Sequence, residues 1–315
     1  MPKGHCAGGE IPRPFYVNFI FMLDRSSIVK YYVGIMNKLS TDKRVQIVRC
    51  LVEGNSIRST CRITGSAKNT VVKLLCDIGA ACLEYQSEVL ANLPCKRIQC
   101  DEIWSFVYSK AKNVPEGKED SAGDVWTWTA ICADTKLVPC WAVGNRDAET
   151  AYYFIHDLAA RLANKVQLTT DGFKAYVNAI DEAFGSDIDF AQLVKIYGNL
   201  PVKNEQIRYS PGVCTGIRVA KHTGNPDANH VSTSFVERQN LTMRMGMRRF
   251  TRLTNAFSKK IENHEHAIAL HFMHYNFCRI HQSLRVTPAM EAGVSDHVWE
   301  LEEVIGLLDK KEKSN

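Results

Sequence analysis

The order of strand-like and helix-like segments between residues 97 and 197 constrains the fold more than any other feature of the chain. Three segments rich in β-branched and aromatic residues come first, separated by polar turns. A helical pattern, a short strand, a second helical pattern and a further strand follow. We therefore predict an α/β domain whose sheet mixes antiparallel and parallel strand pairs. The seven segments are residues 97–107, 124–132, 137–143, 148–162, 166–170, 176–184 and 190–197.

This order of elements matches the ribonuclease H-like fold, in which the first and fourth strands lie side by side. Residues 198–231 hold much Gly, Pro and Asn, which predicts loop with room for one hairpin. From residue 234 to about residue 275 the pattern is helical again, and a final amphipathic helix is expected at 298–308. The late helix should pack across the first and fourth strands.

Before the first strand, residues 40–90 have helical periodicity interrupted by two turns that contain Gly. We expect three helices, which begin at Ser40 or Thr41, after Ser56 and near Ala67. Two short helices and a longer third, joined by tight turns, are typical of a helix-turn-helix. An ordinary small helical bundle is the alternative. A helix-turn-helix would present four side chains near the start of its third helix to the base edges of DNA: Ser66, Lys68, Asn69 and Lys73.

The cysteine pattern bears on the compartment and on metal binding. The eleven cysteines are odd in number and irregularly spaced, and no C-x-x-C pair occurs. This argues against a disulfide framework and a zinc ribbon, and it favours a reducing, cytosolic compartment. The apolar run at 15–23 is too short to cross a bilayer, so no membrane association is expected.

Three carboxylates occupy positions that this fold would bring together. Asp101 lies in the first strand, Asp171 ends the fourth, and Glu237 lies in the first turn of the late helix. Enzymes that cut or join phosphodiesters commonly hold two divalent metal ions between such acids, and Mg²⁺ prefers oxygen ligands. We therefore predict Asp101, Asp171 and Glu237 as catalytic and metal-binding residues for Mg²⁺ or Mn²⁺.

Each of these acids also has an ordinary structural interpretation. Glu102, next to Asp101, should point to the opposite face of the strand, and alternation alone does not choose between the two. Asp171 precedes a glycine and could serve only as a turn residue or a helix N-cap. Glu237 completes a Ser234-x-x-Glu237 capping-box pattern, in which the glutamate bonds back to the helix N-terminus.

A strongly basic stretch follows Glu237. From Arg238 to Lys260 there are seven Lys or Arg and no Asp or Glu, although the net charge of the whole chain is only +5. On a continuous helix, Arg244 and Arg248 would share a face with Glu237 and could grip the DNA backbone. The predicted DNA-binding residues of this stretch are Arg238, Arg244, Arg248 and Arg249.

Four motifs contain these residues or follow them. They are Cys-Asp-Glu-Ile-Trp-Ser-Phe-Val at 100–107, Thr-Asp-Gly-Phe-Lys-Ala-Tyr at 170–176, Ser-Thr-Ser-Phe-Val-Glu-Arg-Gln-Asn-Leu-Thr-Met-Arg at 232–244 and His-Tyr-Asn-Phe-Cys-Arg-Ile-His at 274–281. Together they resemble the DDE transposases of the insertion-sequence-one type, over residues 36–293. The resemblance implies that Asp101, Asp171 and Glu237 coordinate magnesium, which favours Asp101 over Glu102. Better-known members begin with a cysteine zinc finger, and no such set of cysteines precedes Ser40 here.

The resemblance implies a transposase that binds the terminal inverted repeats of an insertion sequence and catalyses metal-dependent DNA strand cleavage and strand transfer. Double-stranded DNA, both repeats and target, is the expected partner. Synapsis of two DNA ends implies a homo-oligomer, a dimer or larger, and the expected location is cytoplasmic, at the nucleoid. The alternatives are a transposase-derived DNA-binding regulator without catalysis, and a ribonuclease H-like nuclease or integrase.

The chain is predicted to divide into four regions. They are an N-terminal extension at 1–35, a small helix-turn-helix domain at 36–92, a ribonuclease H-like catalytic domain at 95–293 and a C-terminal helix or tail at 294–315.

Histidines recur at helical spacing in the late segment, together with Cys278. Such side chains suit a transition metal such as zinc. We expect them instead to border the apolar face that packs this helix onto the sheet, since the resemblance implies no metal there. The histidines are His264, His271, His274 and His281.

Overall fold

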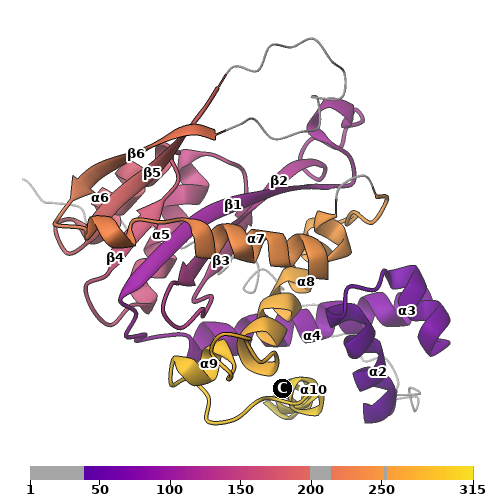
Figure 1. Cartoon of the computed structure of the whole chain (residues 1–315). Helices are drawn as coiled ribbons and strands as arrows, with labels where there is room; N and C mark the ends of the chain where they lie inside the picture. The colour runs from indigo at the N-terminus through magenta and orange to yellow at the C-terminus, as the bar shows by residue number, and fades with distance from the viewer. Residues whose placement is uncertain (1–38, 199–213, 252–253, 315) are drawn as a thin grey trace, which may run out of the picture. The chain divides into compact units, whose positions relative to one another are not determined.

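The computed structural model describes residues 39–198, 214–251 and 254–314. The extension predicted at 1–35 lies outside these residues. Within them, the strands form one mixed six-stranded sheet of order β3-β2-β1-β4-β5-β6 (Figure 1). The strands are β1 (Arg97–Val107), β2 (Gly123–Cys132), β3 (Trp141–Gly144), β4 (Gln167–Thr170), β5 (Asp189–Tyr197) and β6 (Cys214–Thr223).

The predicted mixture of strand directions is confirmed. The first three strands pair antiparallel, as does β5 with β6, whereas β4 runs parallel to both β1 and β5. Two strand predictions need correction. The third strand begins at Trp141 rather than at residue 137, and β6 occupies a segment expected as loop with at most one hairpin. Most of β6 is exposed on both faces, so it lacks the apolar alternation by which a strand is found in a sequence.

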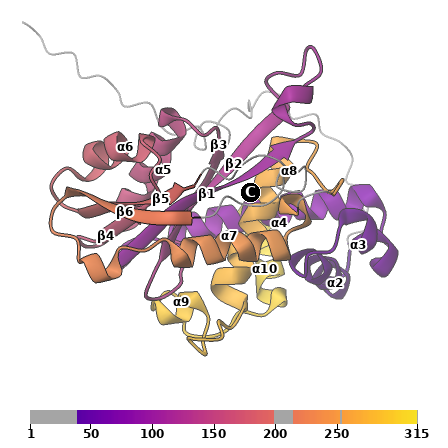
Figure 2. The same ribbon diagram turned by 45° about the horizontal axis from the view of Figure 1, so that its top comes forward.

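Helices cover both faces of the sheet (Figures 1 and 2). On one face lie α5 (Ala148–Arg161) and α6 (Ala175–Phe184), where Trp128 of β2 packs against the rings of Phe154 and Tyr176. On the other face, α7 (Ser234–Gly246) runs across β1 and β2. The predicted packing of the late helix across the first strand is therefore confirmed, but its second neighbour in the sheet is β2 rather than the fourth strand, β4.

The prediction of one helix from residue 234 to about residue 275 is wrong. The helix α7 ends at Gly246, where Met247 takes an extended conformation and buries its side chain. Short turns and further helices follow: η4 (Arg248–Phe250), α8 (Ile261–Met273), the π-helical η5 (His274–Cys278), α9 (Pro288–Glu291) and α10 (Leu301–Ser314). Two further 3₁₀ turns elsewhere are η1 (Ala111–Asn113) and η3 (Ala228–His230).

The three helices expected before the sheet are present as α2 (Thr41–Val52), α3 (Ile57–Thr64) and α4 (Lys68–Val89). Ser40 and Ser56 cap the first two, each accepting a hydrogen bond from a backbone N–H three residues on. The long helix α4 packs against α8 and α10 and shares their apolar core. Their role in binding DNA stays a prediction.

The late histidines belong to the packing of the helices. His264 is fully buried, and its Nε2 atom lies 3.1 Å from the hydroxyl of Ser105 on β1. His271 is buried in α8, whereas His281 lies beyond η5, so the spacing does not form one helical face. Among the described residues, no group suited to hold a metal includes these histidines. No helix in the described part of the chain is long and apolar enough to cross a membrane.

Candidate carboxylate site

The register of two parallel strands brings Asp101 and Asp171 together. Cys100 of β1 pairs with Thr170, the last residue of β4. The residue that follows each of them is an aspartate, so Asp101 and Asp171 lie next to each other at the C-terminal end of β4. Phe173 donates its backbone N–H to Oδ1 of Asp171 over 2.9 Å, which forms the turn that follows the strand. Asp171 therefore does serve a turn, but α6 begins later, at Ala175, and has Lys174 as its N-cap.

A third acid, Glu102, joins these two. The side chains of Asp101, Glu102 and Asp171 offer oxygen atoms that all lie within 4.8 Å of one another. Asp101 accepts a hydrogen bond of 2.8 Å from Nδ2 of Asn240 on α7. Glu102 instead accepts one of 3.2 Å from Nε of Arg146, which precedes α5, and its side chain is buried beside the hydroxyl of Tyr176. The two acids thus approach Asp171 from opposite faces of β1.

Glu237 is placed by an anchor that sequence reasoning missed. The side-chain oxygen of Gln99 on β1 accepts the backbone N–H groups of Phe235 and Val236, which fixes the first turn of α7 against the sheet. The capping box considered as an alternative role for Glu237 is absent, because Thr233 rather than Ser234 is the N-cap. Glu237 instead accepts hydrogen bonds of 2.5 Å from the hydroxyl of Thr233 and from Nζ of Lys195.

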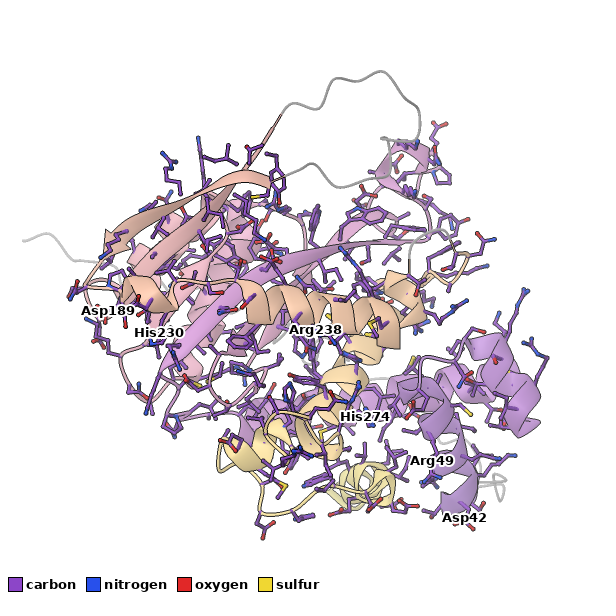
Figure 3. All side chains as sticks on the ribbon, in the orientation of Figure 1. Asp42, Arg49, Asp189, His230, Arg238 and His274 are labelled. Atoms are coloured by element: carbon purple, nitrogen blue, oxygen red, sulfur yellow. The ribbon has the colours of Figure 1, made fainter. Side chains whose placement is uncertain are left out.

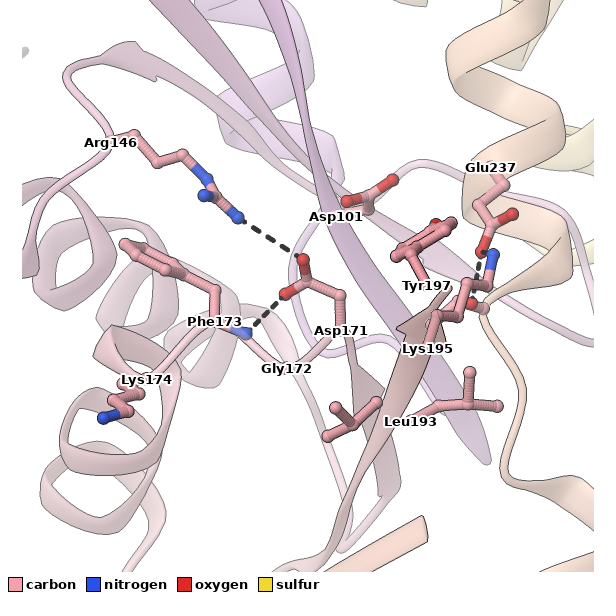
Figure 4. A pocket seen from close by; sticks show the side chains of 12 residues that line it. Asp101, Arg146, Asp171, Gly172, Phe173, Lys174, Leu193, Lys195, Tyr197 and Glu237 are labelled. Atoms are coloured by element: carbon pink, nitrogen blue, oxygen red, sulfur yellow. Dashed lines mark hydrogen bonds and ion pairs between the residues drawn. The ribbon is translucent and has the colours of Figure 1, made fainter. Parts of the chain in front are cut away.

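One hollow of about 630 Å³, here called the carboxylate pocket, contains all three predicted acids. Figure 4 shows Arg146 directed at Asp171 from one side of the pocket and Lys195 directed at Glu237 from the other. Glu237 lines the pocket but lies outside the tighter group of Asp101, Glu102 and Asp171. Its twelve lining residues are Asp101, Arg146, Asp171, Gly172, Phe173, Lys174, Leu193, Val194, Lys195, Tyr197, Thr233 and Glu237.

Burial and neighbouring negative charge disfavour the charged forms of two acids, Asp101 and Glu102. Burial, followed by the negative charge of Asp171, raises the pKa of Asp101 to about 6. The same two causes raise the pKa of Glu102 to about 7. Burial disfavours a charged Lys195, but its ion pair with Glu237 outweighs that effect and raises the pKa of the lysine. A site that holds acids this close together is well suited to a cation.

Two cations of the pocket, Arg146 and Lys195, were not predicted from the sequence. Arg146 sits in the connection from β3 to α5, where its guanidinium stacks on the ring of Phe173 and bridges Glu102 and Asp171. Lys195 lies on β5, the strand next to β4, in a segment that is otherwise mostly apolar. A lysine in such a strand is a weak hint of function, and its ion pair with Glu237 becomes visible only in the folded structure.

The predicted DNA-binding residues fall on three separate elements. Lys68, Asn69 and Lys73 lie exposed in the first turns of α4, where Lys73 pairs with Asp77 over 2.5 Å. Arg238 lies exposed on α7 (Figure 3), and Arg244 is in its last turn. The expected single face of Glu237, Arg244 and Arg248 does not exist. The reason is that α7 ends before Arg248 and Arg249, which form η4.

Comparison with known proteins gives similarity to solved structures only. No protein-family model matches the chain, and no curated protein matches it. Among solved structures, the chain is similar to a piggyBac transposase in a synaptic complex with hairpin DNA, at 10% identity and a TM-score of 0.39. That similarity covers 94% of this chain and 77% of the other.

Proposed function

We propose that this protein is a DNA transposase whose carboxylate pocket catalyses metal-dependent cleavage and joining of phosphodiesters. The single observation that supports this most is the convergence of Asp101, Asp171 and Glu237 on one pocket from β1, the end of β4 and α7. These residues are separated by 70 and 66 positions in the sequence, taken as 171 − 101 and 237 − 171. The four motifs that resemble insertion-sequence-one type transposases supply the assignment to DNA.

The strand order supports a ribonuclease H-like assignment of the sheet. In that fold three antiparallel strands are followed by two parallel ones, and β3-β2-β1-β4-β5 has this order. We assign residues 95–293 to the catalytic domain and residues 36–92 to a helix-turn-helix domain. The C-terminal region, 294–315, would serve the packing of the helices, since α10 packs on α2 and α4.

The donor set of the pocket fits a divalent metal ion. All its acidic side chains offer carboxylate oxygens, the ligand type that Mg²⁺ and Mn²⁺ prefer. The raised pKa of Asp101, caused by burial and by Asp171, is relieved when a cation occupies the site. Asp101 and Asp171 would hold the metal and Glu237 would complete the site. The bound metal would supply Lewis-acid stabilisation of the phosphoryl oxygens.

The chain's own residues orient this site. Asn240 donates a hydrogen bond to one oxygen of Asp101, and Gln99 accepts hydrogen bonds from the first turn of α7, so both ends of this segment of α7 are attached to β1. Arg146 and Lys195 balance the acids when no other cation is present. In the proposed reaction, water first attacks the phosphorus and releases a 3′-hydroxyl. That 3′-hydroxyl then attacks a second phosphodiester in line and displaces its 3′-oxygen.

DNA would be gripped outside the pocket. Arg238 and Arg244 on α7, together with Lys68, Asn69 and Lys73 on α4, are proposed contacts to inverted-repeat or target DNA. Two ends must be joined in one event, so a homodimer or larger assembly in the cytoplasm, at the nucleoid, is part of the proposal.

The experiment is a Mg²⁺-dependent nicking and joining assay on DNA that carries the inverted repeats flanking the gene. Asp171→Asn and Glu237→Gln should each lower both activities by at least about 10³-fold, because each removes a carboxylate that is required in the transition state. Asp181→Asn and Glu182→Gln, exposed acids of α6, are the matched controls and should keep activity.

The outcomes separate the candidate functions. Full activity in both pocket variants would overturn the catalytic assignment. A wild-type protein that binds the repeats without ever cutting them would be a DNA-binding regulator. One that cuts but never joins would be a nuclease.

A further inference from the structure

A second hollow, here called the basic cleft, lies where the helices before the sheet meet the end of α7 and the start of α8. Its volume is about 760 Å³, and it shares no lining residue with the carboxylate pocket. Among the described residues that line it there is no Asp or Glu. Six cationic side chains line it: Arg58, Lys68, Arg248, Arg249, Lys259 and Lys260.

Three helix N-termini open onto the basic cleft. The first residues of α3 and α4 line it, and Lys260, the N-cap of α8, does so as well. Neither Ala67, the N-cap of α4, nor Lys260 makes a side-chain capping hydrogen bond. The partial positive charge of such helix ends favours anions, and backbone N–H groups there suit phosphate oxygens.

Two half-buried or buried side chains in the basic cleft lack the partners that their chemistry calls for. Arg249 donates from Nε to the hydroxyl of Ser258 over 2.7 Å, and no described carboxylate forms an ion pair with it. Burial lowers the pKa of Arg249 to about 10. His271 is only 9% exposed, and its Nε2 atom has no hydrogen-bond partner in the described structure. A guanidinium without an ion pair and a buried ring nitrogen without a hydrogen bond indicate that an anionic ligand binds here and supplies the missing interactions.

We propose that the basic cleft binds the phosphodiester backbone of duplex DNA, with Arg249 as its deepest phosphate contact. The choice of DNA as the ligand depends on the proposed function, whereas the existence of an anion-binding site depends only on the residues that line the cleft. Six cations spread over four segments exceed the need of one small anion and match a backbone with many phosphates. Lys68 lies both in the cleft and at the start of α4. One duplex that meets α4 would therefore continue into the cleft, away from the carboxylate pocket.

The test is fluorescence anisotropy with a labelled duplex of inverted-repeat sequence, measured in EDTA at several salt concentrations. Lys259→Gln/Lys260→Gln, which changes two exposed side chains, should weaken binding about tenfold and reduce the slope of log K against log salt by about two. Arg249→Gln should weaken binding by a similar factor, and Arg249→Lys by less. The matched control is Lys96→Gln/Lys165→Gln, two exposed lysines that precede β1 and β4.

Each outcome supports or overturns the proposal. Wild-type affinity and an unchanged salt slope in Lys259→Gln/Lys260→Gln would overturn it, as would an equal loss in the Lys96→Gln/Lys165→Gln control. A single-stranded RNA that binds more tightly than the duplex would overturn the choice of DNA. Because the assay contains no divalent metal, failure of catalysis in the nicking assay leaves this result unaffected, and the reverse also holds.

Discussion

The carboxylate pocket is lined mainly by residues of strands and of the turn after β4, whereas the basic cleft is lined by the N-termini of α3, α4 and α8. In the pocket, the pairing of β1 with β4 forces Asp101 and Asp171 into proximity, and Arg146 and Lys195 partly balance the acids. In the cleft, cations gather around helix N-termini and no described acid balances them. The lining of the pocket holds three acids and three cations, with Glu102 as a fourth acid beside them, whereas the lining of the cleft holds cations and no acid. The close carboxylates suit a metal cation, and the uncompensated cations suit a polyanion.

The two regions meet through α7. Its first turn carries Glu237 at the pocket, and its last residue, Gly246, lies at the cleft. There Gly54, in the turn between α2 and α3, approaches so closely that a Cβ atom on it would stand 2.8 Å from the carbonyl oxygen of Gly246. The turn between α2 and α3 therefore lies directly against α7, the helix that carries Glu237.

The largest loss of stability is expected from a substitution that forces this contact apart. Gly54 has a φ of +77°, so Gly54→Ala adds both backbone strain and the contact with Gly246, and it should lower the free energy of unfolding by ~3 kcal/mol. Gly65→Ala is the control, because its φ is +66° but no atom lies within 4 Å of the new methyl group. It should cost only ~1 kcal/mol in urea unfolding. Equal losses in the two variants would show that α7 and the turn do not press on each other.

How much of this could be read from the sequence differs between the regions. The strand order and the positions of Asp101 and Asp171 were predictable, because β1 is rich in β-forming residues and β4 runs into an Asp-Gly turn before a helical pattern. The break in the late helix was not, since Met247 and Phe250 continue the helical apolar stripe although Met247 is extended. The basic cleft could not be foreseen either, because its cations come from four segments that only the packing of the helices brings together.

A smaller effect on stability is expected from the raised pKa of Asp101, which an ordinary surface acid would not show. The folded chain keeps a proton on Asp101 up to about pH 6, whereas the unfolded chain releases it near the ordinary value of 3.8. Folding thus takes up a proton between these values, and this acid's contribution to stability falls as the pH rises across that window. Without metal, Asp101→Asn should be more stable than wild type by ~2 kcal/mol above pH 6 and by almost nothing at pH 4. A stability difference between Asp101→Asn and wild type that does not change with pH in thermal unfolding would contradict the raised pKa of Asp101.

The smallest effect concerns the cation that faces Glu237. Lys195 is about one-third exposed, so its pair with Glu237 should contribute ~1 kcal/mol or less. If Lys195 occupies the place of a metal, Lys195→Met should tighten Mn²⁺ binding by up to about fivefold in calorimetric titration. Lys174→Met changes an exposed lysine of the same pocket that forms no ion pair in the described structure, and it should leave the affinity unchanged. Weaker Mn²⁺ binding in Lys195→Met would mean that the lysine supports the site instead of competing for it.

The most direct measurement of the central claim is anomalous X-ray scattering from crystals soaked in Mn²⁺. The account predicts an anomalous peak in the carboxylate pocket, ligated by oxygens of Asp101 and Asp171, and no peak there in Asp171→Asn crystals. Manganese that binds elsewhere, or that remains in the pocket of Asp171→Asn without loss, would contradict a metal-dependent phosphoryl-transfer site at this edge of the sheet.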